Sequence, residues 1–415
     1  MVSNILPTSI CLLPHCAYLS QTSRMIEIYR ALQQRGITPR VATYGGTYET
    51  ALRAAGIDYD LVGPRMDDER CARFLREQPS SGPVRQSGYS DQELRAYATA
   101  EAEYFTRHGI DTVVTGFSLT ATLSSRLAGV RLVTEHSASW VPPVFESRPL
   151  PPAVRFTAAL LNRVRFYCGG FNRVAAELGV AGLPSTAALL LGDLTLVTEA
   201  PEVLGLPAER IEAWRPGRGY RPETRLRVTG PLFAHLPIPL PDEVERFLDR
   251  PGPVVYVAIT SSSPALVRAT VSALRPLGAR ILVAGTVHDL GDLADDRVLV
   301  AGVLPSHLVM PRVDLAVTAG GQGSVQTAMA AGVPLLGLPL QPEQRLNVTL
   351  VERRGAGRWV RPGDAGGARL TASAGELLGD DRYRQAAEVI RKLYAEIDGP
   401  GNAADAILSQ QGPGR

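Results

Sequence analysis

The stretch that decides the fold reads DLAVTAGGQGSVQTAMAAGVPLLGLPLQPEQRLN and covers residues 314–347. An apolar run leads into a turn with three glycines, Gly320, Gly321 and Gly323, and small residues at helical spacing follow. A second apolar run ends at Pro339. The order strand, glycine turn, helix, strand is typical of a parallel α/β unit.

The glycine turn itself is a candidate anion site. A turn from a strand into a helix directs backbone N–H groups and the positive end of the helix dipole at one spot. Ser324 could add a hydroxyl donor there. A plain tight turn explains the same glycines equally well, because the spacing matches neither the Walker A motif nor G-x-G-x-x-G.

Strand and helix patterns alternate twice along the chain, on either side of a proline-rich stretch. This rhythm predicts an α/β fold with two doubly wound, Rossmann-like domains. Ligands of such sheets bind at the carboxyl ends of the strands, so we expect a cleft between the domains. The expected divisions are a first domain at 1–230, a linker at 231–241, a second domain at 242–395 and a terminal helix or tail at 396–415.

The composition is that of an ordinary soluble globular protein, with 45% hydrophobic and 20% charged residues. The net charge of +2 gives no indication that the protein binds nucleic acid. The cysteines, Cys11, Cys16, Cys71 and Cys168, form no C-x-x-C pair, so we expect reduced thiols in a cytoplasmic protein. The interrupted N-terminal apolar run is interpreted as a strand, not a signal peptide, and no run is long enough for a transmembrane helix.

The motif of the opening stretch continues without a gap. From Ala319 it reads A-G-G-Q-G-S, then AAGVP at 330–334, then P-L-Q-P-E-Q-R-L-N from Pro339 to Asn347. This resembles the nucleotide-sugar motif of GT-B glycosyltransferases of the UDP-glycosyltransferase-like kind, H-G-G-x-G-T/S, A-A-G-V-P and P-x-x-x-D/E-Q-x-x-N. The resemblance covers nearly the whole chain and is most specific in its C-terminal half.

The resemblance implies a GT-B fold, in which the first domain binds an acceptor and the second a nucleotide sugar. It also implies an inverting, metal-independent transfer of a sugar from a UDP or dTDP donor to a small hydrophobic acceptor, in natural-product biosynthesis. No cofactor, metal or nucleic acid is expected, and the protein should be a monomer or homodimer. The implied donor-binding residues are Gly320, Gly321, Gly323 and Ser324 at the diphosphate, Glu343 and Gln344 at the sugar, Val303 and Leu304 at the base, and Thr260 and Ser261 near phosphate.

Three positions depart from the family pattern. Ala319 replaces the histidine of the glycine turn, and Thr327 replaces the glutamate that holds the ribose. Gln21 stands at the position of the catalytic histidine, on the acceptor side with Phe117 and Trp140. An amide does not titrate usefully, so Gln21 cannot be a general base. Loss of the ribose glutamate would suit a dTDP donor, which lacks a 2′-hydroxyl.

The general base must then come from elsewhere. His15 ends the first predicted strand, and Glu135 with His136 ends another strand of the first domain. Both groups are candidates because the carboxyl ends of parallel strands should open into the cleft. A structural role for either histidine remains an alternative.

Two further alternatives stay open at the level of sequence. The same fold is used by non-hydrolysing nucleotide-sugar epimerases, and a non-catalytic homologue could bind a nucleotide or a partner protein. The segment 148–173 mixes arginine with aromatic residues and could contact a membrane, although a helix packed on the first domain explains it as well.

Overall fold

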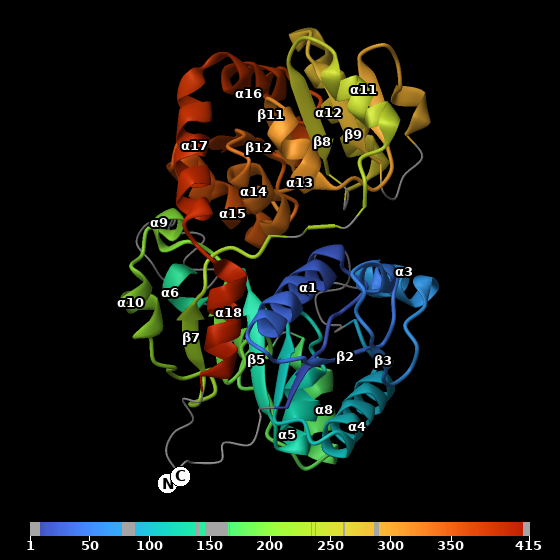
Figure 1. Cartoon of the computed structure of the whole chain (residues 1–415), viewed down its shortest axis with the longest axis vertical. Helices are drawn as coiled ribbons and strands as arrows, with labels where there is room; N and C mark the ends of the chain where they lie inside the picture. The colour runs from blue at the N-terminus through green and yellow to red at the C-terminus, as the bar shows by residue number, and fades with distance from the viewer. Residues whose placement is uncertain are drawn as a thin grey trace. The chain divides into compact units, whose positions relative to one another are not determined.

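The computed structural model divides the chain into two compact units (Figure 1). Unit 1 comprises Met1–Leu232 and Asp398–Arg415, and unit 2 comprises Phe233–Ile397. The structure describes residues 9–76, 88–137, 141–145, 165, 167–233, 235–236, 238–259, 262–285 and 290–409.

The centre of unit 1 is a parallel sheet of seven strands in the order β3-β2-β1-β4-β5-β6-β7. Most of its strands are short and buried, as expected for strands that are covered on both faces. Their bounds are Ile10–Leu12 (β1), Arg40–Thr43 (β2), Asp60–Leu61 (β3), Thr112–Thr115 (β4), Arg131–His136 (β5), Leu194–Val197 (β6) and Arg225–Val228 (β7).

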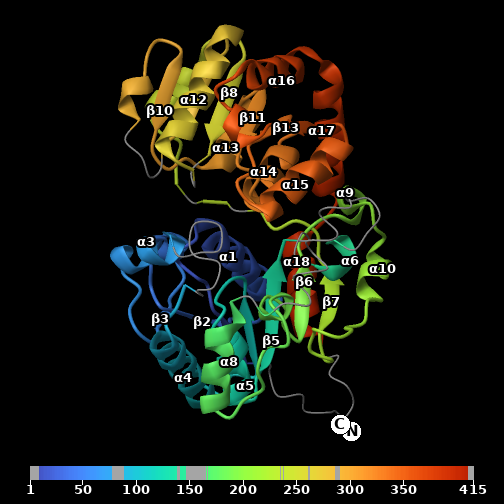
Figure 2. The same ribbon diagram turned by 180° about the vertical axis from the view of Figure 1, so that it is seen from behind.

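Helices cover both faces of this sheet. Residues Ile10 and Leu12 pack with α1 and α18, whereas Cys11 and Leu13 pack with α4 and α5, as the two-residue period of a strand requires. Figure 1 shows α1 and α18 over one face, and Figure 2 shows α4, α5 and α8 over the other. The helices of unit 1 are Leu19–Gln34 (α1), Glu49–Ala54 (α2), Asp68–Arg76 (α3), Asp91–Arg107 (α4), Ala121–Ala128 (α5), Pro142–Phe145 (α6), Cys168–Glu177 (α8), Pro201–Leu204 (α9), Ala208–Glu212 (α10) and Gly399–Leu408 (α18).

Unit 2 contains a second parallel sheet, in the order β10-β9-β8-β11-β12-β13. Its strands are Val254–Ala258 (β8), Arg280–Ala284 (β9), Val298–Ala301 (β10), Leu315–Thr318 (β11), Leu335–Gly337 (β12) and Gly357–Trp359 (β13). Its helices are Asp242–Asp249 (α11), Pro264–Leu274 (α12), Ser306–Val309 (α13), Gln322–Ala330 (α14), Pro342–Arg353 (α15), Ala368–Gly379 (α16) and Asp381–Ala395 (α17).

Each sheet reverses its strand order at one place, between β1 and β4 in unit 1 and between β8 and β11 in unit 2. The connections on the two sides of such a switch point diverge and leave a crevice at the carboxyl ends of the strands. Ligands of open α/β sheets bind there. The loops after these four strands are therefore the expected position of a ligand site.

Among the described residues, none of the helices combines the length and the apolar composition that crossing a bilayer demands. The predicted amphipathic segment 148–173 lies outside the described residues, except for 165 and 167–173.

Candidate active site

The glycine turn of unit 2 connects β11 to α14 at the switch point. Gly320 has a left-handed backbone, with φ of 86°, and a Cβ there would lie 2.5 Å from Val348 Cγ2 and 2.8 Å from the Gln344 carbonyl oxygen. Gly321 differs, because a Cβ there would meet no atom of the described chain within 4 Å. Gly320 is therefore needed for the turn, whereas Gly321 leaves space beside the N-terminus of α14.

Two side chains hold this turn in place. Thr318 Oγ1 accepts the backbone N–H of Gly320 at 3.0 Å, and Asn347 Nδ2 donates to the Gly320 carbonyl oxygen at 3.1 Å. Asn347 Nδ2 also donates to Glu343 Oε1 at 2.7 Å. The asparagine of the motif thus ties the glycine turn to α15, a structural role that the sequence interpretation did not assign to it.

The two predicted sugar-binding residues lie in the first turn of α15. Glu343 is partly exposed and is oriented by Asn347, and Gln344 is buried. Gln344 Oε1 accepts the backbone N–H of Leu340 at 2.8 Å. This contact fixes the amide, so that its nitrogen is the donor that the side chain can offer to a ligand. Both side chains therefore belong to α15, the helix that Asn347 links to the glycine turn by a hydrogen bond.

The predicted base-binding loop follows β10. Leu304 is buried and Val303 is exposed, and Ser306 Oγ lies 3.2 Å from the hydroxyl of Tyr256 on β8. Thr260 and Ser261, the predicted phosphate ligands after β8, lie outside the described residues. Thr327, at the position of the family's ribose glutamate, donates its hydroxyl to the Gly323 carbonyl oxygen at 2.8 Å. Its hydrogen bond therefore lies within α14.

In unit 1 the structure places His15 in the interior. Its ring stacks on Phe74 with centroids 4.7 Å apart, and its Nε2 lies 3.1 Å from the Tyr89 hydroxyl. Burial lowers the pKa of His15 to about 3, so the imidazole is neutral near pH 7 and is a weak proton acceptor.

Glu135 is also buried, but it belongs to a polar cluster. Arg24 Nε donates to Glu135 Oε1 at 2.8 Å. With its amide oriented to suit both neighbours, Gln21 donates to Glu135 Oε1 at 2.9 Å and accepts from Arg24 Nη2 at 2.6 Å. Burial raises the pKa of Glu135 and the charge of Arg24 opposes that rise. The structure therefore brings two predicted site residues, Gln21 and Glu135, into contact.

His136 follows Glu135 on β5, but successive side chains of a strand point to opposite faces. Glu135 faces α1 through its contact with Arg24, so His136 lies on the other face. Burial and, to a smaller extent, the positive charge of Arg24 together lower the pKa of His136 to about 3. Glu135 and His136 therefore point to opposite faces of the sheet and cannot both face the same substrate atom.

An aromatic pair lies at the ends of β1 and β4, on the two sides of the switch point of unit 1. Phe117 contacts Tyr18 edge to face, with ring centroids 5.4 Å apart, and both side chains are partly exposed. Trp140, the other predicted acceptor-side aromatic residue, lies outside the described residues. Phe117 thus stays a candidate contact for an apolar acceptor.

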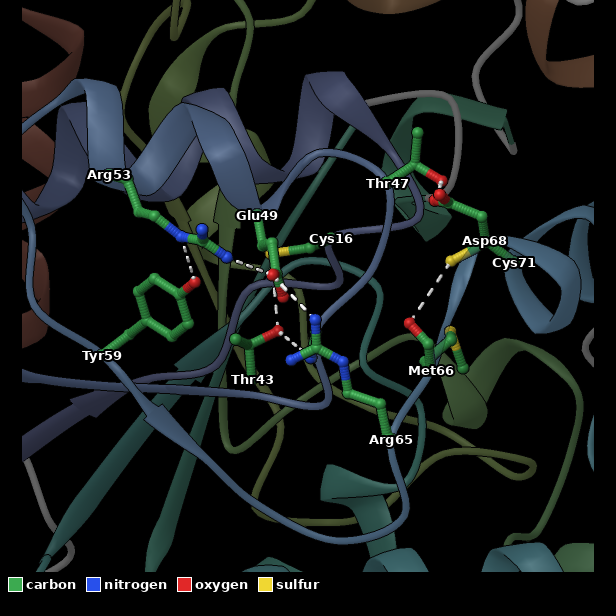
Figure 3. Close-up of polar contacts among 11 residues, drawn as sticks. Cys16, Thr43, Thr47, Glu49, Arg53, Tyr59, Arg65, Met66, Asp68 and Cys71 are labelled. Carbon is green, nitrogen blue, oxygen red and sulfur yellow. Dashed lines mark hydrogen bonds and ion pairs between the residues drawn. The ribbon is translucent and has the colours of Figure 1, made fainter.

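A second polar cluster follows β2, near the edge of the sheet of unit 1. Figure 3 shows Glu49 between Arg53 and Arg65, and Arg65 Nη2 donates to Glu49 Oε1 at 2.8 Å. Thr47 donates to Asp68 Oδ1 at 2.7 Å in the same region. These contacts hold the loops after β2 and β3 together, so we assign this cluster to the fold.

The chain is similar in sequence to proteins of known families. Residues 268–407 match the family described as erythromycin biosynthesis protein CIII-like, C-terminal domain. A PGL/p-HBAD biosynthesis glycosyltransferase of Mycobacterium tuberculosis (strain ATCC 25177 / H37Ra) is 28% identical over 330 residues, which cover 75% of this chain and 72% of that protein. This relative is named as a glycosyltransferase, not as an epimerase.

Two solved structures share the fold of nearly the whole chain. The spinosyn forosaminyltransferase SpnP has a TM-score of 0.67 at 16% identity, over 96% of this chain and 98% of that one. The glycosyltransferase VinC, solved in complex with dTDP, has a TM-score of 0.65 at 17% identity, over 96% of this chain and 99% of that one. The predicted fold, two Rossmann-like domains of the GT-B type, is confirmed.

Proposed function

We propose that this chain, a GT-B glycosyltransferase of the kind that serves secondary metabolism, moves a sugar from a dTDP donor to a small hydrophobic acceptor with inversion of the anomeric carbon. The glycine turn of unit 2 is the donor site in this proposal. The observation that carries it is the open space at Gly321, beside a helix N-terminus and at a switch point.

The diphosphate charge is balanced by the protein backbone in this proposal. The first N–H groups of a helix lack partners within the helix, and the dipole there is positive. Gly321, Gly323 and Ser324 present those groups at the start of α14. Because the helix compensates the charge, the transfer should need no divalent metal.

The choice of dTDP rests on two observations. Thr327 donates its hydroxyl to its own helix, so the family's ribose contact has no equivalent at this position. A deoxyribose lacks the 2′-hydroxyl that such a contact would bind. VinC, which shares the fold, was solved with dTDP.

Glu343 and Gln344 bind the donor sugar in this proposal. A carboxylate accepts hydrogen bonds from sugar hydroxyls and is stronger than a neutral acceptor, while the amide nitrogen of Gln344 donates. Asn347 orients Glu343, and the Leu340 N–H orients Gln344. The sugar contacts are therefore fixed before the donor binds.

The proton acceptor in this proposal is Glu135. The acceptor oxygen attacks the anomeric carbon from the side opposite the diphosphate, the bond to the diphosphate breaks, and the hydroxyl proton moves to the base. His15 and His136 are weak bases, because burial lowers the pKa of each to about 3. Burial has the opposite effect on a carboxyl group and raises the pKa of Glu135 towards the range that suits a base.

The test of the donor site compares Gly321→Glu with Gly363→Glu. Gly363 also lies in unit 2 and also has no atom of the described chain within 4 Å of a built Cβ. A carboxylate at Gly321 should repel the diphosphate and abolish binding of dTDP in calorimetry, whereas the control should bind normally.

Transfer should then be followed with a dTDP sugar and a panel of hydrophobic alcohols and phenols. The product should have the inverted anomeric configuration by NMR, and chelation with EDTA should leave the rate unchanged. Normal dTDP binding by Gly321→Glu would remove the donor-site assignment, and a retained configuration would exclude the single displacement.

A further inference from the structure

Three polar side chains are buried together beneath the start of α1. Gln21, Arg24 and Glu135 are at most 9% exposed and contact one another, and Gln21 and Glu135 meet over Gly116, which follows β4. A Cβ on Gly116 would overlap the Gln21 amide and the Glu135 carboxylate. The missing side chain at this position is therefore what lets an amide from α1 reach a carboxylate on β5.

The two oxygens of Glu135 have different surroundings. Oε1 accepts from Arg24 and from Gln21, whereas Oε2 is buried with no hydrogen-bond partner among the described residues. A buried carboxylate oxygen without a donor is costly, and such groups are rare in folded proteins. The cluster thus holds one oxygen firmly and leaves the other to accept a hydrogen bond.

We propose that Gln21 and Arg24 are positioning residues for Glu135: they bind Oε1 and so direct Oε2 at the hydroxyl of the acceptor. This inference rests on the proposed function. The hydroxyl proton passes to Oε2 as the acceptor oxygen bonds to the anomeric carbon. The electron pair of the broken bond leaves with the nucleoside diphosphate, so atoms and charge balance.

In this arrangement Gln21 is not the relic of a lost active site. A histidine at this position would itself take the proton, but a glutamine can only donate and accept hydrogen bonds. The proton acceptor has therefore moved from α1 to β5, and the residue at the old position holds the new base in place. Gly116 provides the room that this exchange requires.

Arg24 is the charged group that acts on Glu135. It lies on α1; β4 contributes Gly116, and β6 pairs with Glu135 through the apolar Leu196. His136 is next along β5 but on the opposite face. Removal of the Arg24 charge should therefore destabilise the carboxylate form of Glu135, and the acid limb of the activity profile should move to higher pH.

The experiment measures kcat and KM against pH for the full chain, with a dTDP sugar and a hydrophobic acceptor. Gln21→Met keeps the volume of the side chain but removes both hydrogen bonds. It should lower kcat roughly 10- to 100-fold, because a displaced base loses its alignment, with little change in the KM of the donor. Gln21→Asn should recover part of the loss.

Two arginine variants test the charge. Arg24→Gln should move the acid limb to higher pH, and Arg24→Lys should move it less, because the positive charge is retained. Gln33→Ala and Arg30→Gln, at less buried positions of the same helix, are the controls and should keep the parent's kcat and profile. Thermal unfolding and dTDP affinity show whether each variant is folded.

The outcomes separate the inference from the function on which it rests. A parent that binds the dTDP sugar but transfers it to no acceptor overturns the proposed function. A parent that transfers sugar, together with a folded Gln21→Met variant of unchanged kcat and pH profile, overturns the positioning role alone. If Gln21→Met does not fold, an unshifted acid limb in Arg24→Lys and Arg24→Gln overturns it.

Discussion

At the scale of single residues, Glu101 is a carboxyl group that the proposed reaction does not use. It is fully buried on α4 and accepts hydrogen bonds from Tyr44, Thr120 and Ser124. Burial raises the pKa of Glu101 from 4.5 to about 7, although the three hydroxyl donors oppose the rise. The folded protein therefore holds a proton that the unfolded chain releases at lower pH.

This residue should make stability depend on pH. Because the folded state binds more protons between the two pKa values, stability is full below pH 4.5 and falls as the pH rises to about 7. Glu101→Gln mimics the protonated form and should remove that decline, which amounts to roughly 2–4 kcal/mol. Chemical denaturation over this pH range measures it. Glu103→Gln, exposed on the same helix, should decline like the parent; an equal decline in Glu101→Gln would contradict the assignment.

The residues of the candidate site could be predicted from the sequence only in part. The motif predicts Gly320, Gly321 and Ser324 as donor ligands from neighbours a few positions away, and that assignment stays a prediction. The sequence named Gln21 and Glu135 separately, but their contact depends on Gly116 and on packing between α1 and β5, segments more than a hundred residues apart. The burial of His15 was equally hidden, since Phe74 and Tyr89 reach it from distant parts of the chain.

At the scale of elements, the β11–α14 connection uses two adjacent glycines for different purposes. Gly320 should be intolerant of a side chain, because its φ is 86° and a Cβ would contact Val348 and Gln344. Gly320→Ala should lose about 1–3 kcal/mol of stability in thermal unfolding. Gly321→Ala should unfold like the parent and should instead weaken dTDP binding. Equal stability of the two variants would show that the turn relaxes without cost.

At the scale of the whole molecule, α18 returns to unit 1 after unit 2 is complete. Ile407 and three alanines of α18 lie in the core that β1 and α1 form, and Arg35 binds Asp405 at the surface. Ile407→Ala should cost about 2–5 kcal/mol, because it leaves a cavity, whereas Asp405→Ala should cost less than about 1 kcal/mol. Thermal unfolding with and without dTDP checks this. The loss should fall on unit 1 and leave nucleotide affinity unchanged, so a parallel loss of affinity would contradict it.

The return of α18 also sets an order of assembly during synthesis. Domains commonly fold as they emerge, the N-terminal one first. Here unit 2 is an insertion within unit 1, because residues 403–407 supply part of the core around β1 and are translated after all of 233–397. Unit 2, encoded later, is thus the first to have its whole sequence available. Until α18 has been synthesised, unit 1 cannot complete its core, and one apolar face of its sheet stays incompletely covered. During that time the growing chain is most prone to aggregate and to bind chaperones.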